Sequence, residues 1–214
     1  MQINLENENK KEFDVQLDVH ETNFLNGLIE LKKWWFCYEH VWFNPKNLYD
    51  VEITNKYSYL FDILTVFSSE SNNKIYQHTK SNIECGIGYI LLFDQVVRHI
   101  KRVEPTKYNW LKLELNIDSI VEFSKQFYLK FSSELGPNEF CFVLMSLRHT
   151  MNFDLIKYVI KETWNKIYEI KSKPNQNISD ILIYKRFLEA TYKRSLDGKG
   201  STYIYDLELN PESK

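Results

Sequence analysis

The stretch with the most chemical potential in this chain runs from residue 90 to residue 102 and reads ILLFDQVVRHIKR. It is a nearly continuous apolar run that is interrupted by Asp94, Gln95, Arg98 and His99. A helix that is apolar on almost all sides is buried, and polar groups buried on it need partners. Asp94 and Arg98 stand one helical turn apart, so we expect them to pair with each other and with groups on another helix. The cluster either locks the core or forms a site for acid/base chemistry.

Two other regions carry side chains that would complete such a site. His149 follows the apolar run FVLMSL, which places it at a helix C-terminus, where the helix dipole favours a protonated imidazole. The alternative is that His149 faces Asp94, and either of them is then the candidate catalytic acid or base. Gln95 and Arg98, with Arg186 and Arg194 on the last predicted helix, are candidate ligand-binding residues for an anionic group. A solvated basic face is the alternative for the last helix.

Aromatic side chains concentrate in ten residues near the N-terminal end of the predicted domain. They are Trp34, Trp35, Phe36, Trp42 and Phe43. Few basic residues accompany them, so we expect the cluster to pack in the core, where each buried Trp needs a partner for its N–H. The alternative is that one ring, with Trp35 as the candidate, lines a ligand groove or stacks on a base.

The standard sequence motifs of catalysis and metal binding are missing. The chain contains no GxxxxGK phosphate loop, no Rossmann glycine pattern after a strand, no HExxH and no GxSxG. The five histidines include no pair at ligand spacing, so we expect neither a metal nor another cofactor. Cys37, Cys85 and Cys141 are odd in number and widely spaced, which fits reduced thiols in the cytoplasm.

Composition limits the choice of partners. The formal net charge is -2, which gives no electrostatic reason to bind nucleic acid. No apolar run is long enough to span a membrane, and the N-terminus lacks the pattern of a secretory signal. The apolar content of 43% supports a sizeable buried core. These features leave a protein partner or a small anionic ligand as the expected occupants of any site.

The spacing of apolar residues predicts an all-α fold with about seven helices joined by short loops. The predicted helices cover residues 24–36, 51–69, 82–102, 119–135, 138–149, 155–171 and 181–195. Residues 68–73 read as a polar linker, and Gly86 and Gly88 in the central helix suggest close approach of another backbone. We expect a polar extension over residues 1–21, a single domain of antiparallel helical hairpins over 22–200, and a polar tail over 201–214.

Polar residues and glycine mark where these helices begin. We expect N-caps at Thr22 or Asn23, Ser81 or Asn82, Asn152 or Asp154, and Ser179 with Asp180, with Gly136-Pro137 opening the helix that ends at His149.

Four motifs in this order resemble the bacterial family catalogued as domain of unknown function 924. The matching segments are Trp34-Trp35-Phe36 with Trp42-Phe43 and then Asp50, Leu91 to His99 with Arg102, Met145 with His149, and Arg186-Phe187 with Lys193-Arg194-Ser195, Asp197-Gly198 and Ser201-Thr202. The chain has Val96-Val97 where the family has Phe-Pro, His99 where it has Asn, and Met151 where it has an acid. The resemblance covers roughly residues 28 to 207 and implies a tetratricopeptide-like stack of antiparallel helix pairs. It implies no reaction.

Two classes of function follow from these observations. The first is a helical binding or interaction protein with a buried Asp-Gln-Arg cluster. The second is a small-molecule-binding protein or enzyme, in which Asp94 or His149 is the acid or base and arginines hold an anionic ligand. The loss of the family's acid at Met151 favours the binding class, and the sequence leaves open whether the protein is an enzyme.

Overall fold

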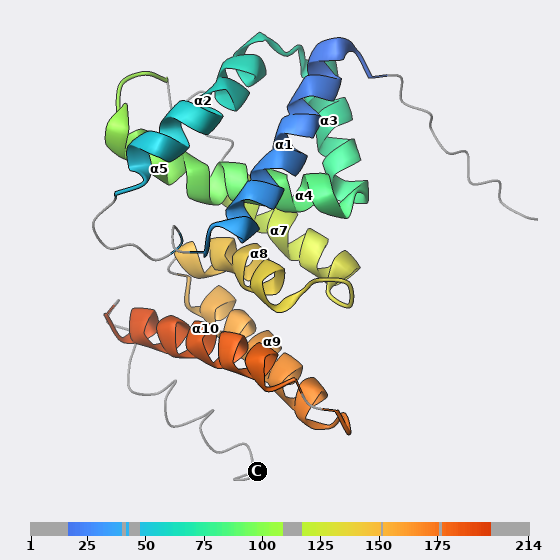
Figure 1. The fold of residues 1–214 in the computed structure, drawn as a ribbon, viewed down its shortest axis with the longest axis vertical. Helices are drawn as coiled ribbons and strands as arrows, with labels where there is room; N and C mark the ends of the chain where they lie inside the picture. The colour runs from blue at the N-terminus through green and yellow to red at the C-terminus, as the bar shows by residue number, and fades with distance from the viewer. Residues whose placement is uncertain are drawn as a thin grey trace, which may run out of the picture.

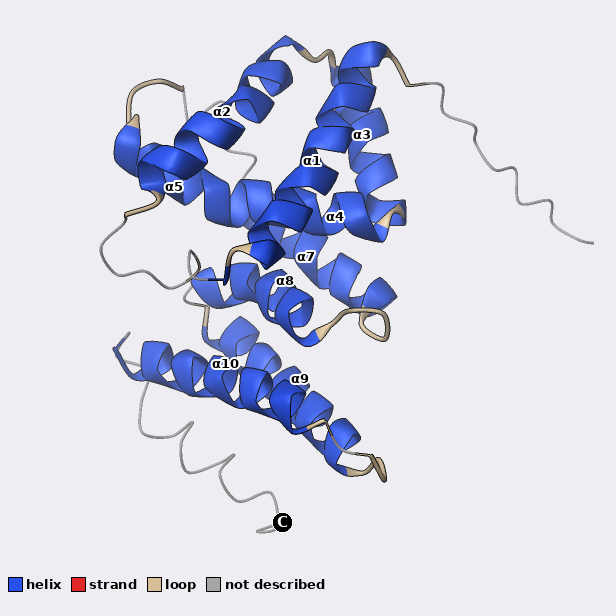
Figure 2. Ribbon diagram, in the orientation of Figure 1, coloured by secondary structure: helices blue, strands red, loops and turns tan. Residues whose placement is uncertain are grey.

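The computed structural model describes residues 17–39, 42, 48–108, 117–150, 152–175 and 177–197. Within these ranges every regular element is helical (Figure 2). The elements are α1 (Val19–Cys37), α2 (Asp50–Val66), α3 (Ser69–Ser81), α4 (Ile83–Ile90), η2 (Leu91–Val96), α5 (Val97–Val103), α7 (Ile117–Phe131), α8 (Pro137–His149), α9 (Phe153–Lys171) and α10 (Ile178–Asp197). Because α4, η2 and α5 follow one another without a break, they form one long helix.

The helices stack along the long axis of the molecule in chain order (Figure 1). The long helix α4–η2–α5 packs against α1, α2 and α3, while α7 and α8 form a second layer, and α9 and α10 pair in a third. Helix α8 contacts both the long helix and α10, so it joins the layer of the long helix to the layer of α9 and α10. The prediction of an all-α single domain is therefore confirmed, and the finer tetratricopeptide-like arrangement stays a prediction.

One helix was missed by the sequence interpretation. Residues 68–73 are not a linker, because α3 begins at Ser69 and Ser68 caps it, with its hydroxyl accepting a hydrogen bond from the Ser71 amide at 3.1 Å. Only Ile75 and Thr79 on this helix are buried. With so few apolar residues, the sequence of α3 shows no helical spacing. The helix is stabilised by its cap and by packing against α4.

The outer boundaries of the predicted domain also shift. Helix α1 begins at Val19 rather than after Thr22, because Asp18 and Glu21 form a capping box around its first turn. Part of the predicted extension over residues 1–21 is thus helical. At the last helix, Asn177 rather than Ser179 is the capping side chain, since its Oδ1 accepts from the Ser179 amide at 3.1 Å. Residues 1–16 and the predicted tail over 201–214 lie outside the described residues.

Three other predicted helix starts are confirmed. Asn82 caps α4 with a hydrogen bond to the Cys85 amide, Gly136 precedes Pro137 at the start of α8, and Asn152 caps α9.

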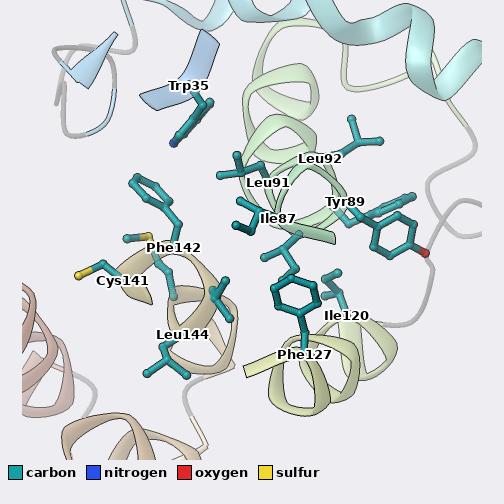
Figure 3. Close-up of a cluster of buried hydrophobic side chains, with 14 of the residues drawn as sticks. Trp35, Ile87, Tyr89, Leu91, Leu92, Ile120, Phe127, Cys141, Phe142 and Leu144 are labelled. Carbon is teal, nitrogen blue, oxygen red and sulfur yellow. The ribbon is translucent and has the colours of Figure 1, made fainter. Parts of the chain in front are cut away.

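Two glycines of α4 explain how closely the helices pack. A Cβ at Gly88 would overlap the backbone of Leu28 on α1, and one at Gly86 would overlap the Phe127 ring on α7. The predicted close approach of another backbone is therefore confirmed, with α1 as the neighbour at Gly88. The core forms around this crossing, where side chains from α1, α4, α7 and α8 meet near Ile87 (Figure 3).

Candidate functional site

The middle of the long helix is wound as a π-helix from Leu91 to Val96, and all six of its residues are buried. Asp94 and Gln95 lie on this segment. π-Helical turns inside α-helices are rare, and those that occur are frequently found at functional sites. The helix therefore changes its winding at the point where the sequence places its polar residues.

Asp94 is only 3% exposed and is surrounded by donors from three directions. The His149 ring nitrogen Nδ1 lies 2.8 Å from Asp94 Oδ1 and 3.0 Å from Oδ2. Gln95 Nε2 donates to Oδ2 at 2.5 Å, and the Arg98 guanidinium donates to Oδ1 at 3.1 Å and to the Asp94 carbonyl at 2.8 Å. The expected i,i+4 pair is present, and His149 at the end of α8 is the partner from another helix.

These contacts set the protonation states of the pair. Burial raises the pKa of Asp94, but the hydrogen bond from His149 and the charge of Arg98 outweigh it and hold that pKa below its ordinary value. Burial lowers the pKa of His149 more than the neighbouring carboxylate raises it. An ionised Asp94 only accepts hydrogen bonds, so the neutral imidazole carries its proton on Nδ1 and has Nε2 as its basic nitrogen.

A second buried carboxylate lies at the first residue of α2. Asp50 is 5% exposed, and its Oδ1 is 2.6 Å from Nδ1 of His99. The Arg102 guanidinium donates to both carboxylate oxygens, at 2.6 Å to Oδ2 and 2.8 Å to Oδ1. Both donors are on α5, so this cluster ties α2 to the long helix.

The second cluster has the same electrostatic pattern as the first. Burial raises the pKa of Asp50, but the hydrogen bonds from Arg102 and His99 outweigh it and lower that pKa. Burial lowers the pKa of His99 despite the bond to Asp50. Arg102 also lies 3.0 Å from His99 Nδ1, but both groups are donors when that nitrogen bonds the carboxylate. The hydrogen bonds to Asp50 therefore define the cluster.

A pocket of about 390 Å³ lies between α8 and α10, next to the C-terminal end of α1. It is lined by Glu39, Trp42, Asn138, Cys141, Phe142, Arg148, Ile183, Arg186, Phe187 and Ala190. Trp42 is fixed in its wall, because its indole N–H donates to the Trp35 carbonyl at 2.7 Å. The lining is mostly apolar and carries charged residues of both signs.

Two charged residues of the pocket, Glu39 and Arg148, lie at opposite ends of α8. Near the start of the helix, Asn138 Nδ2 donates to Glu39 Oε1 at 3.3 Å. Near its end, Arg148 is buried with its guanidinium carbon 5.3 Å from the centre of the Phe187 ring. The pocket therefore has an acidic end and a basic end.

The structure brings four of the sequence-predicted site residues together and separates the others. Asp94, Gln95, Arg98 and His149 form one cluster, whereas Arg186 lines the pocket, to which none of those four contributes. Arg194 lies on α10, and its side chain is outside the described residues.

Trp35 is a core residue rather than a pocket residue. It is 1% exposed, and its ring packs against the rings of His99 at 6.0 Å and Phe142 at 5.7 Å. Its indole N–H has no hydrogen-bond partner among the described residues. The expected core packing of the aromatic cluster holds for Trp34 and Trp35, and the partly buried Phe36 and Trp42 also pack against the core. Trp42 lines the pocket as well, and Phe43 lies outside the described residues.

Sequence reasoning did not identify the Asp50 cluster or the acidic end of the pocket. Asp50 is 49 residues from His99, and Glu39 is 99 residues from Asn138, so no local spacing reveals either contact. For Asp50, the only hint was its place in the family resemblance, ahead of the second predicted helix.

No family model, curated protein or solved structure matches this chain. Across the described part of the chain, no helix is both long and apolar enough to cross a membrane. Nor does that part bring together three His, Cys, Asp or Glu side chains as a metal site would. All three cysteines are free thiols, with Cys37 exposed and the other two buried.

Proposed function

We propose that this protein binds a small ligand with an anionic group and an apolar body in the pocket between α8 and α10. The observation that carries the proposal is the pocket itself, whose volume of about 390 Å³ lies in the range of small-ligand sites. Its lining is mostly apolar and also contains Arg148 and Arg186. The proposal takes up the small-molecule-binding alternative that the sequence leaves open, with arginines holding an anionic ligand.

The two arginines suit an anion for a physical reason. An arginine presents several N–H donors in a fixed fork that matches the oxygens of a carboxylate or phosphate. Arg148 is buried against Phe187, where water screens a charge less than it does at the surface. Apolar lining residues such as Phe142 and Ile183 would cover the body of the ligand.

Octanoate is a simple probe of this proposal, and octanol is its uncharged counterpart. We expect octanoate to bind the protein in calorimetry, with octanol binding more weakly. Arg186 is exposed, so Arg186→Gln should fold normally and bind octanoate about tenfold more weakly, as expected for the loss of a charge-assisted hydrogen bond. Lys185→Gln removes an equal charge from an exposed neighbour outside the pocket and should change nothing. Equal octanoate affinities in the two variants, or no binding by the parent protein, would overturn the proposal.

A second candidate function is acid/base chemistry at His149. It is favoured by the Asp94 contact, which holds the proton on Nδ1 and leaves Nε2 as the base, as a carboxylate does for a catalytic histidine. A reacting base must be reachable, and the His149 side chain is 11% exposed. Diethyl pyrocarbonate should therefore modify His149 at neutral pH, as it should the exposed His20. Modification of His20 with complete protection of His149 would remove this candidate.

We also propose that the chain is a divergent member of the domain of unknown function 924 family and that it works in the cytoplasm. Support for the first proposal comes from the position of the matching motifs. Asp50 contacts the segment that contains Asp94 to Arg102, and that segment contacts His149, although the three motifs are far apart in sequence. Support for the second comes from the three free thiols.

A further inference from the structure

We propose that the pocket selects a zwitterion whose two charges are far apart, namely an ω-amino carboxylate with its carboxylate toward Arg148 and Arg186 and its ammonium toward Glu39. This inference rests on the proposed function and adds the class of ligand to it. It follows from the positions of the charged residues along α8, from the charge of Glu39, which its neighbour does not neutralise, and from the apolar lining between the two ends.

The two ends of the pocket are separated by most of the length of α8. Asn138, which bonds Glu39, and Arg148 are ten residues apart on this helix. At the rise of an α-helix, their backbones lie about 15 Å apart along its axis. An α-amino acid carries its ammonium and carboxylate on one carbon, so it would not reach both ends.

We place Arg186 at the same end of the pocket as Arg148. It precedes Phe187 on α10, and the Phe187 ring is the one that faces the Arg148 guanidinium. Both arginines line the pocket. A carboxylate at this end would therefore meet donors from two helices, which is the arrangement that favours an anion over a neutral group.

Glu39 is oriented but not neutralised by its neighbour. The side-chain amide of Asn138 donates to one carboxylate oxygen of Glu39, and an amide carries no charge. The other oxygen and the remaining lone pairs can accept hydrogen bonds from an ammonium group. An anion at this end would be repelled, so the acidic end distinguishes a zwitterion from a simple fatty acid.

The lining between the two ends fits an apolar chain. Cys141 and Phe142 lie between Asn138 and Arg148 on α8, and Ile183, Phe187 and Ala190 contribute from α10. Burial of methylene groups against such residues is favourable in proportion to the area covered. The ligand that satisfies all three parts of the pocket has an amine, an apolar spacer and a carboxylate in that order.

The test is calorimetric titration of the full chain with ω-aminooctanoate, octanoate and α-aminooctanoate. We expect ω-aminooctanoate to bind about fivefold tighter than octanoate, since an exposed ion pair contributes up to that factor. α-Aminooctanoate carries the same groups with both charges at one end, and it should show no such advantage. Glu39→Gln should abolish the advantage of ω-aminooctanoate and leave octanoate binding unchanged or slightly stronger. Glu189→Gln, an exposed change on α10 outside the pocket, is the matched control and should preserve the advantage.

The outcomes separate this inference from the proposed function. If octanoate binds as proposed but ω-aminooctanoate binds no tighter, or if Glu39→Gln leaves its advantage intact, the selection of a zwitterion is wrong and the anion pocket stands. If neither ω-aminooctanoate nor octanoate binds the parent protein, both proposals fall.

Discussion

The long central helix takes part in two buried carboxylate clusters that are built from the same parts in different ways. Each contains an aspartate, a histidine that contacts it through Nδ1, and an arginine. Asp94 is itself on the long helix and receives donors from its own helix and from α8. Asp50 is on α2 and receives both of its donors from α5.

This difference determines how each cluster depends on its members. Asp94 has three separate donor residues, and two of them, His149 and Gln95, are largely buried. Among the described residues Asp50 has only two donor residues, and the side chain of Arg102 is 40% exposed. A donor that reaches water loses less when its acceptor is removed, whereas a buried donor keeps the full cost of desolvation. We therefore expect the Asp94 cluster to depend most on its carboxylate and the Asp50 cluster to depend most on its arginine.

The largest expected effect is that of removing each carboxylate. Asp94→Ala should lower the free energy of unfolding by about 3 to 5 kcal/mol, because it leaves the His149 and Gln95 donors buried beside Arg98. Asp50→Ala should cost less, about 1 to 3 kcal/mol, because Arg102 can turn toward water. Urea unfolding followed by circular dichroism measures both values. The variants Asp94→Asn and Asp50→Asn keep one acceptor oxygen and should each recover part of the loss. Equal costs for the two alanine variants would contradict the distinction between the clusters.

Removing the arginines should reverse the order. Arg102→Ala takes away two of the three donor contacts to Asp50 and should cost about 2 kcal/mol, whereas Asp94 keeps His149 and Gln95 in Arg98→Ala, for which we expect about 1 kcal/mol. If Arg98 were the only partner of Asp94, as their i,i+4 spacing alone would suggest, Arg98→Ala would cost more than about 2 kcal/mol. The structure supplies two other donors. A larger loss for Arg98→Ala than for Arg102→Ala would mean that Arg98 neutralises Asp94 in a way the other donors do not replace.

The sequence predicted those parts of the fold that depend on local spacing. Apolar residues at helical intervals located seven of the helices, and side chains that cap helix ends, such as Asn82 and Asn152, located several of their starts. Helix α3 was missed because only Ile75 and Thr79 are buried, so its sequence resembles a polar loop. Its stability comes from tertiary packing against α4, which no local pattern encodes.

At the candidate site too, contacts that follow from local spacing were predicted, and features that depend on the packing of distant segments were missed. The i,i+4 spacing of Asp94 and Arg98 predicted their pair, and the position of His149 at a helix end made it a candidate partner. The π-helical winding around Asp94 was not predicted, since its residues are also compatible with an α-helix. The pocket arises where the end of α1 meets α8 and α10, so it depends on how distant segments pack.

The smallest expected effect is a change in how stability depends on pH, and it tests what the two clusters share. Burial lowers the pKa of both His149 and His99 below the unfolded value of about 6.5. The unfolded chain therefore takes up protons first as the pH falls, so the stability contributed by the neutral imidazoles is complete above about pH 6.5 and is lost below it. The unfolding free energy of the parent protein should be lower at about pH 5.5 than at about pH 7.5, and His149→Gln and His99→Gln should each reduce that difference. Glutamine keeps an amide donor for the carboxylate but does not titrate. The opposite result, a parent protein that is more stable at about pH 5.5 than at about pH 7.5, would contradict this prediction. It would show that the neighbouring carboxylates raise the pKa of the two histidines more than burial lowers it, so that both imidazoles are charged in the folded state.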